Sequence, residues 1–327
     1  MSEPDLTRRS FIKLACYLSA LPVLSILPGC VQSRPLKVAS HVWPGYEFMF
    51  LAQNLGYLNS NLVQLTETLS ASSSLERLLA KEVDGAALTL DEVLMARSRG
   101  VKLSIVQVFD ISAGADMVMA RPGITRPRDL KGKTIGVETG ALGEVMLHHL
   151  LQASEMKKTD VRVVASKINQ HLSDWKSNQL DAVITYQPVA SQLAALGARN
   201  IFDSRSLPNT ILDVLAIRED ALILRDGLRH LIACHFKGQQ HYLNNHVDAI
   251  YRMSERLALP VAEVDNAFRG LILPDLRSNH KLLFGEPSVV KQTARKISTI
   301  MVEVGMLSKE DDLHELIKPE FLSTSLL

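Results

Sequence analysis

Polar and aromatic side chains follow most of the strand-like runs of this sequence, at the points where a strand would end. The first run is followed by Trp43, Tyr46 and Glu47, in the stretch HVWPGYEFMF. Aromatic faces can stack on a planar or methylated solute, and carboxylates can pair with N–H donors or positive charge. Because ligands of open α/β sheets bind outside the carboxyl ends of the strands, we expect such residues to meet in one pocket. The predicted ligand-binding residues are Trp43, Tyr46, Glu47, Ser70, Ser72, Thr89, Asp116, Glu138, Thr139, Tyr186 and Asp213.

The same residues have simpler structural roles that the sequence leaves open. Trp43 and Tyr46 can pack the following helix onto its strand, as a hydrophobic staple does. The serines that begin at Ser70 can cap a helix, although free N–H groups at a helix start also bind anions. Asp91 and Asp110 also follow strand-like runs, and no Lys or Arg stands among these strand-end residues. If two of the carboxylates face the pocket, they favour a solute with N–H donors or positive charge over a simple oxyanion.

Motifs of nucleophilic, metal and nucleotide chemistry are absent from the sequence. It contains no G-x-S-x-G, no H-E-x-x-H, no C-x-x-C and no glycine pattern of a nucleotide-binding turn. The ten histidines are dispersed, and the adjacent His148 and His149 point to different faces of their predicted helix. We therefore expect no catalytic residue, no metal and no cofactor, although a buried carboxylate pair can do acid/base work.

Short strand-like runs alternate with helical runs from Leu36 onward. The strand-like runs are LKVASHV, LVQLTETL, DGAALTL and VKLSIVQVFD in a first block, then KGKTIGVETG, VRVVAS, DAVITYQP and NIFD in a second. ILDVLAIRED, at 211–220, is a further strand-like run, and 221–320 is predicted to be helical with no strand. This alternation predicts parallel sheets covered by helices, in two α/β units that share strands across a hinge.

The N-terminus resembles an export signal. TRRSFIK, with the pair Arg8 and Arg9, is similar to the twin-arginine motif, and an apolar run from Leu14 to Leu27 follows it. That run is shorter than the roughly 20 apolar residues that a membrane span needs. An N-terminal anchor helix is the alternative.

The segment LPGC then resembles a lipobox, which implies that Cys30 is lipidated and becomes the mature N-terminus. Pro28 departs from that motif, whereas its other positions fit. Of the other two cysteines, Cys16 lies in the signal and Cys234 is expected to be a buried core thiol.

Several blocks, in their order and spacing, resemble the solute-binding proteins of ABC importers in the nitrate, taurine/sulfonate and thiamine-pyrimidine-precursor (NMT1/THI5-like) group. They are WPGYEFMFLAQNLGYL, LSASSSLERLLAKEVDGAALTLDEVL, VFDISAGADMVMARPGITRPRDLKGKTIGVETGALG, LDAVITYQPVASQLAALGARNIFDS and ILDVLAIRED. The resemblance implies a type II periplasmic-binding fold, in which two α/β lobes with a ligand cleft and a hinge close on a solute. The expected parts are an export signal (1–29), a tether (30–35), lobe 1 (36–115 and 215–327) and lobe 2 (116–214).

The composition is that of an ordinary globular protein, with 46% hydrophobic and 22% charged residues. A formal charge of +1 gives no reason to expect a nucleic-acid partner. The resemblance implies a monomeric extracytoplasmic receptor, a periplasmic or cell-surface lipoprotein, that delivers a small solute to the permease of an ABC importer. The acidic strand ends make a nitrogen-containing organic solute the expected ligand. The alternatives are a lipoprotein that reports ligand to a membrane signalling receptor, a receptor for sulfonate or nitrate, and an enzyme that acts on its bound ligand.

Overall fold

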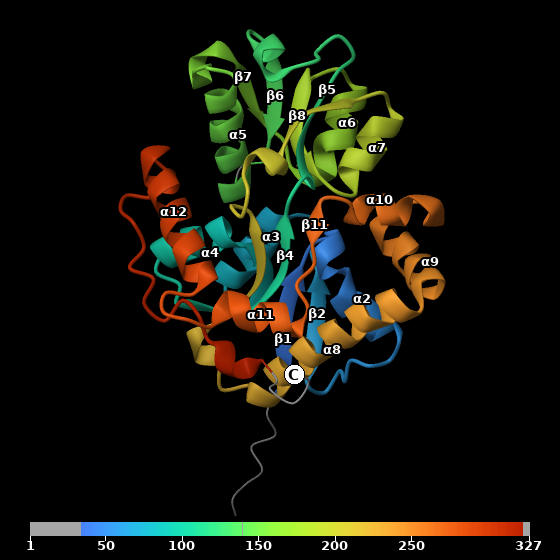
Figure 1. Ribbon diagram of the computed structural model, residues 1–327, viewed down its shortest axis with the longest axis vertical. Helices are drawn as coiled ribbons and strands as arrows, with labels where there is room; N and C mark the ends of the chain where they lie inside the picture. Colours follow the sequence, from blue (N-terminus) through green and yellow to red (C-terminus); the bar gives the residue numbers. More distant parts are fainter. Residues whose placement is uncertain (1–33, 139, 323–327) are drawn as a thin grey trace, which may run out of the picture. The chain divides into compact units, whose positions relative to one another are not determined.

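The strands of the described residues form two separate β-sheets (Figure 1). The computed structural model describes residues 34–138 and 140–322, which belong to one unit that begins at Arg34. The predicted residues Arg8, Arg9, Cys30 and Thr139 lie outside the described residues. Within those two ranges, no helix combines the length and the apolar character that a membrane span needs.

The first sheet has six strands in the order β11-β4-β10-β3-β1-β2. Their bounds are β1 (Leu36–Ser40), β2 (Val63–Glu67), β3 (Gly85–Thr89), β4 (Leu103–Ser112), β10 (Leu212–Arg218) and β11 (Leu271–Ile272). Strand β1 runs parallel to β2 and β3, whereas β10 runs antiparallel to both of its neighbours, β3 and β4. Every residue of β3, β4 and β10 is buried, because helices cover both faces of these central strands.

The second sheet has five strands in the order β7-β6-β8-β5-β9. Their bounds are β5 (Asp116–Ala120), β6 (Thr134–Val137), β7 (Arg162–Ala165), β8 (Ala182–Tyr186) and β9 (Arg199–Asp203). Successive residues of a strand point to opposite faces. Val118 of β5 therefore packs with α5 (Ala141–Ala153), while Met119 packs with α6 (His171–Lys176) and α7 (Val189–Ala195) on the other face (Figure 1).

Eight further helices accompany the first sheet in the described part of the chain. They are α2 (Glu47–Asn54), α3 (Ala71–Leu79), α4 (Leu90–Ser98), α8 (Arg225–Asn244), α9 (His246–Leu257), α10 (Val264–Phe268), α11 (Leu276–Leu283) and α12 (Val289–Glu303). Helices α2 and α8 pack so closely that a Cβ on Gly238 would overlap the carbonyl of Phe48. Residues 221–320 are mainly helical, as predicted, but the prediction of no strand there was wrong, because the two-residue strand β11 pairs with β4.

The chain crosses between the sheets after β4 and again after β9. The prediction of parallel sheets was right only in part, because the sheets are mixed. Strand β1 is parallel to β2 and β3, and β6 is parallel to β7 and β8, whereas β5 and β10 each follow a crossing and run antiparallel to their neighbours. The predicted boundary between residues 214 and 215 falls inside β10. Strand β5 was not predicted as a strand.

Hydroxyl groups join the two crossings. The Ser204 hydroxyl accepts from the Gly114 N–H at 2.6 Å and lies 2.8 Å from the Ser112 hydroxyl, which in turn accepts from the Asp116 N–H at 3.2 Å. This chain of hydrogen bonds couples the geometry of one crossing to that of the other.

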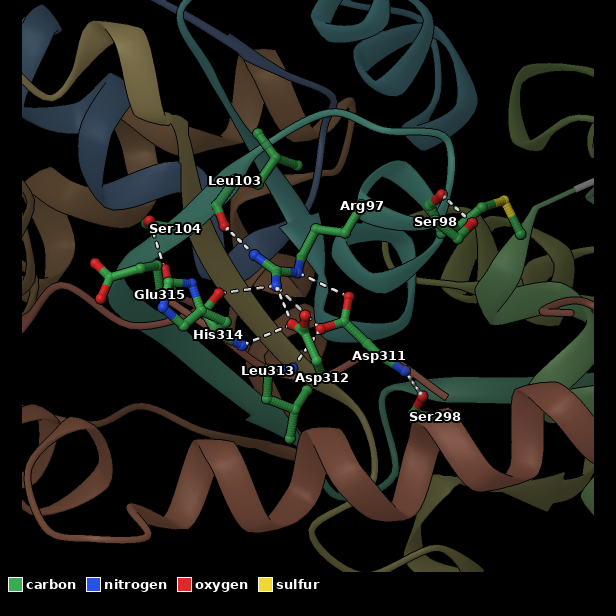
Figure 2. Close-up of polar contacts among 11 residues, drawn as sticks. Arg97, Ser98, Leu103, Ser104, Ser298, Asp311, Asp312, Leu313, His314 and Glu315 are labelled. Carbon is green, nitrogen blue, oxygen red and sulfur yellow. Dashed lines mark hydrogen bonds and ion pairs between the residues drawn. The ribbon is translucent and has the colours of Figure 1, made fainter. Parts of the chain in front are cut away.

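Arg97 of α4 ties the C-terminal segment to the first sheet (Figure 2). Its guanidinium donates to the Asp311 carboxylate through Nε at 2.8 Å and Nη2 at 3.0 Å, and to the carbonyls of Leu103 at 2.8 Å and His314 at 2.9 Å. The bidentate contact fixes the plane of the guanidinium. A cavity of about 550 Å³ lies beside this segment. Leu103 is at the amino end of β4, whereas the predicted ligand-binding residues follow the carboxyl ends of the strands. The cavity therefore lies at the opposite end of the sheet from those residues.

Candidate ligand-binding site

Strand register brings predicted acidic residues together at the ends of the two sheets. In the first sheet, Asp213 of β10 pairs with Thr89 of β3 and with Asp110 of β4. In the second sheet, Asp116 of β5 pairs with Tyr186 of β8. The antiparallel strands begin where their neighbours end, so the first residues of β10 and β5 lie beside the last residues of the strands next to them.

The turn after β1 places two aromatic residues against the acidic row of the first sheet. Trp43 Nε1 donates to Asp110 Oδ2 at 2.9 Å, and the Tyr46 hydroxyl donates to Asp213 Oδ1. A side chain is excluded from position 45, because a Cβ on Gly45 would overlap the Asp110 carboxylate. Glycine in this turn therefore lets the backbone approach the carboxylate that Trp43 orients.

Asp110 and Asp213 form a buried carboxyl pair. They are 0% and 3% exposed and stand opposite each other in the register of β10 and β4. Burial raises the pKa of Asp110 to about 7, and burial followed by the charge of Asp110 raises the pKa of Asp213 well above its usual range. The pair therefore holds at least one proton near neutral pH.

The second lobe contributes Tyr186, Asp116 and Glu138. The Tyr186 ring meets the Trp43 ring nearly edge-on, with the centroids 5.5 Å apart. The Tyr186 hydroxyl and Asp116 Oδ2 are buried without a hydrogen-bond partner in the part of the chain that the structure describes. Glu138 follows β6 and reaches the first lobe, where its Oε1 accepts from the Ser72 hydroxyl at 2.7 Å and from the Ser72 N–H at 3.4 Å.

Asp91 and Glu92 add two buried carboxyls at the start of α4. Glu92 Oε2 accepts from the Thr89 N–H at 3.0 Å, as in a capping box. Burial raises the pKa of Asp91 to about 6, and burial together with the charge of Asp91 raises the pKa of Glu92 to about 8. Burial also raises the pKa of Asp116 to about 7. Several carboxyls of the site thus change charge close to neutral pH.

Two small cavities lie among these side chains. One has a volume of about 20 Å³ and is lined by Ala71, Ser72, Glu92, Asp116, Glu138, Gly140, Leu142, Gly143, Ile184, Thr185 and Tyr186. The other has about 10 Å³ and is lined by His41, Trp43, Ala71, Thr89, Asp116, Leu142, Tyr186 and Asp213. A water needs roughly 10–15 Å³, so each cavity has room for about one water.

The described residues that line the two cavities include no Lys and no Arg. Burial, followed by the charge of Arg256, lowers the pKa of His41 to about 3, so this ring is neutral as well. The same described residues contain no group of three or more His, Cys, Asp or Glu side chains arranged to hold a metal ion. The charge of the site is therefore negative wherever its carboxyls are ionised.

Most of the predicted ligand-binding residues lie at these cavities, and their contact with a solute stays a prediction. Tyr46 and Ser70 line neither cavity. The Tyr46 hydroxyl donates to the Asp213 carboxylate, and Ser70 caps α3 by accepting from the Ser73 N–H at 3.1 Å. The predicted residues that line a cavity are Trp43, Ser72, Thr89, Asp116, Glu138, Tyr186 and Asp213.

Glu47 departs from the prediction and does not line either cavity. Its carboxylate is 1% exposed and pairs with Arg256 of α9, whose Nε also contacts Glu67 at 2.6 Å and whose guanidinium lies 3.5 Å from the Phe50 ring centroid. These residues line another cavity, of about 410 Å³, beside α2 and α9. Because Arg256 already satisfies its charge, Glu47 is an internal ion-pair partner, and we no longer propose it as a solute contact.

Three residues of the site were absent from the predicted set. Asp110 stands at a strand end but is not among the predicted residues, and its partner Trp43 is 67 positions away. Glu92 stands three residues after Thr89, which is the spacing of a capping box and could have indicated it. His41 contacts the Tyr46 and Tyr186 rings at 5.3 and 5.7 Å between centroids, and no sequence signal indicated this.

Comparisons with known proteins agree with this architecture. The sequence profile of the family described as NMT1/THI5 like matches residues 43–247. A Brucella abortus (strain 2308) protein, provisionally named a binding protein, is 36% identical over 88 residues, a segment that spans 27% of this chain and 27% of the relative. The alkanesulfonate-binding protein of Xanthomonas axonopodis pv. citri, bound to MOPS, is 16% identical with a TM-score of 0.73 over 88% of this chain and 99% of that one. The nitrate-binding protein of Synechocystis PCC 6803 is 11% identical with a TM-score of 0.71 over 89% and 87%.

The structural likeness confirms the predicted fold class, two α/β lobes of the type II periplasmic-binding fold. The profile match covers more than half of the chain and includes strands of both sheets. On this match, the chain belongs to the NMT1/THI5-like family.

Proposed function

We propose that this protein is an extracytoplasmic receptor that binds a small organic solute with N–H donors or positive charge and delivers it to an ABC importer. One observation carries the proposal. Asp116 Oδ2 is buried at both cavities without a described hydrogen-bond partner, in a site whose described lining has acidic side chains and no Lys or Arg.

The cost of burying charge favours a cationic ligand over an anionic one. A buried carboxylate without a partner is strongly unfavourable, and a cationic or N–H-rich ligand removes that penalty by pairing with it. An anion would need paired positive groups and would add repulsion from Asp110, Asp116 and Asp213. Trp43 and Tyr186 add aromatic surface on which a planar nitrogen heterocycle or a guanidinium can stack.

The proposed mechanism of binding is closure of the two lobes around the solute, and it involves no catalytic step. A solute that enters between the lobes would contact Trp43 from one side and Tyr186 from the other. It would shift the equilibrium between open and closed forms towards the closed form, because it binds that form more tightly. Contacts between the lobes accompany the closed form. Besides Glu138 with Ser72, Lys167 Nζ lies 4.0 Å from Glu76 Oε1, and Gln192 Nε2 donates to the Ala258 carbonyl at 3.1 Å.

A receptor for a sulfonate or nitrate is the second candidate. Two structural relatives are described as binding an alkanesulfonate and nitrate. The start of α3 also faces the larger of the two cleft cavities through Ala71 and Ser72, and helix starts attract anions. Against this candidate, the described residues that line the two cavities include acidic side chains and no Lys or Arg.

Thermal-shift and calorimetric titration with small probes tests the proposal. Methylguanidinium, methylammonium and 4-aminopyrimidine are the positive set, and methanesulfonate and nitrate are the anionic set. We expect at least one member of the first set to raise the unfolding temperature in a concentration-dependent way, because a ligand of the native state stabilises it. Micromolar binding of an anion together with no binding of any nitrogen probe would falsify the proposal.

Export and anchoring form a separate part of the proposal, supported by the sequence motifs at Arg8, Arg9 and Cys30. Lipid on Cys30 would hold the receptor at the membrane, close to a permease. Cys30→Ser is expected to move the protein from the membrane fraction to the soluble extracytoplasmic fraction. A variant that stays with the membrane would favour the anchor-helix alternative.

A further inference from the structure

We propose that Glu138 sets the charge selectivity of the cleft, because its carboxylate fills the place at the start of α3 where an oxyanion would bind. This inference rests on the proposed function and names one residue responsible for it. It concerns selectivity between ligands of opposite charge at the same site.

The contacts of Glu138 carry the argument. Glu138 is 8% exposed and extends from the end of β6 to the other lobe, where its Oε1 accepts from both the hydroxyl and the N–H of Ser72. Ser72 lies in the first turn of α3, and the next N–H of that turn, Ser73, already donates to the Ser70 hydroxyl. The carboxylate thus takes donors that a bound oxyanion would otherwise use.

Helix physics explains why this place suits an anion. The first N–H groups of a helix have no partner within the helix, and the helix dipole gives its N-terminus a partial positive charge. Bound phosphate, sulfate or carboxylate groups therefore occur at such positions. In this chain the Glu138 carboxylate occupies that position. An anion in the adjoining cavity would be repelled by the negative charge of this carboxylate at short distance.

Packing holds the Glu138 backbone in place. Gly143 of α5 approaches so closely that a Cβ there would overlap the Glu138 carbonyl. The Tyr186 hydroxyl, which has no described hydrogen-bond partner, lines the same cavity as Glu138 and Ser72. If the carboxylate is removed, this hydroxyl remains as a donor for an oxyanion, beside the positive end of the α3 dipole.

The test compares Glu138→Ala and Glu138→Gln with the wild type by calorimetric titration of methanesulfonate, nitrate and methylguanidinium. We expect Glu138→Ala to bind methanesulfonate or nitrate at least about 10-fold more tightly than the wild type, since removal of the nearby charge lowers the repulsion. Glu138→Gln should show a smaller gain, because the amide removes the charge but still occupies the space. Both variants should lose methylguanidinium affinity.

Glu144→Gln is the matched control. This residue lies on α5 in the same lobe, its carboxylate pairs with Lys158 at 2.8 Å, and its substitution changes the net charge by the same amount. It should leave both anion and cation binding unchanged. If Glu138→Ala does not fold, the near-isosteric Glu138→Gln decides the question.

Two results would overturn the inference. One is a folded Glu138→Gln or Glu138→Ala whose anion affinity equals that of the wild type. The other is an equal gain in Glu144→Gln, which would assign the effect to net charge. A wild type that binds an anion with micromolar affinity and binds no nitrogen probe refutes the proposed function, whereas a gain of anion binding in the Glu138 variants would still support the role of this residue.

Discussion

Asp116→Asn is expected to weaken the binding of methylguanidinium by about 100-fold or more. Asp116 is 2% exposed, lines both cavities of the cleft, and has an oxygen without a described partner. Removal of one charge from a buried, hydrogen-bonded ion pair typically costs several kcal/mol, which is the source of this magnitude. Asparagine keeps the size and shape of the side chain, so the loss measures the charge. Calorimetric titration at pH 8, where the Asp116 carboxyl is ionised, gives the dissociation constants.

The ligand-free Asp116→Asn protein should unfold at the same temperature as the wild type or at a higher one, because a buried carboxylate without a partner destabilises the native state. This gain in stability with a loss of binding distinguishes a ligand contact from a structural residue. Asp226→Asn is the control, since Asp226 is exposed in the first turn of α8 and its substitution changes the charge equally. Unchanged methylguanidinium affinity in Asp116→Asn would contradict the assignment of this carboxylate.

The affinity for methylguanidinium should rise steeply with pH, by about 50-fold between pH 5 and pH 7 for each carboxyl with a pKa of about 7 that must lose its proton on binding. Burial raises the pKa of Asp110 and Asp116 to about 7, so both are mostly protonated at pH 5. A cation binds the ionised form, and each pH unit below the pKa costs a factor of about 10. Methylguanidinium keeps its charge over this range, so its own ionisation does not enter. Titration in buffers of different ionisation enthalpy measures the protons released, and a constant affinity from pH 5 to pH 8 would contradict the prediction.

The same pKa shift gives a stability prediction of opposite sign for the ligand-free protein. Between about pH 4 and pH 7 the native state keeps the Asp116 proton while the unfolded chain has lost it, so the native state binds more protons. The free energy of unfolding should therefore fall as the pH rises through this window. Urea unfolding of the wild type and Asp116→Asn over the window isolates this contribution, because the variant lacks the group. Parallel pH profiles of the two proteins would contradict it.

The place of the site could be predicted from sequence because strand ends are local features. A run of apolar residues that stops at a polar or aromatic one marks the end of a strand, and parallel strands bring such ends together. Tyr186 ends its strand in this way, whereas Asp213 stands at the start of β10. The antiparallel register of β10 and β5 sets Asp213 and Tyr186 beside Asp110 and Asp116.

What could not be predicted depends on contacts between distant parts of the chain. Glu47 stands next to Tyr46 in sequence, yet its carboxylate pairs with Arg256, 209 positions away. The helical periodicity of α9 does not indicate which element its arginine will meet. The antiparallel direction of β5 and β10 likewise follows from where the chain crosses between the sheets, and no local pattern encodes that direction.

The position of β10 between β3 and β4 also bears on synthesis of the chain. The second sheet draws all its strands from the continuous stretch between Asp116 and Asp203, so its lobe has every strand it needs once that stretch has left the ribosome. The first sheet lacks its central strand until Arg218 has been made. Until then β3 and β4 present open edges, which are sites for mispairing with other chains. The edges of β3 and β4 are therefore open to mispairing from the completion of β4 until β10 joins the first sheet.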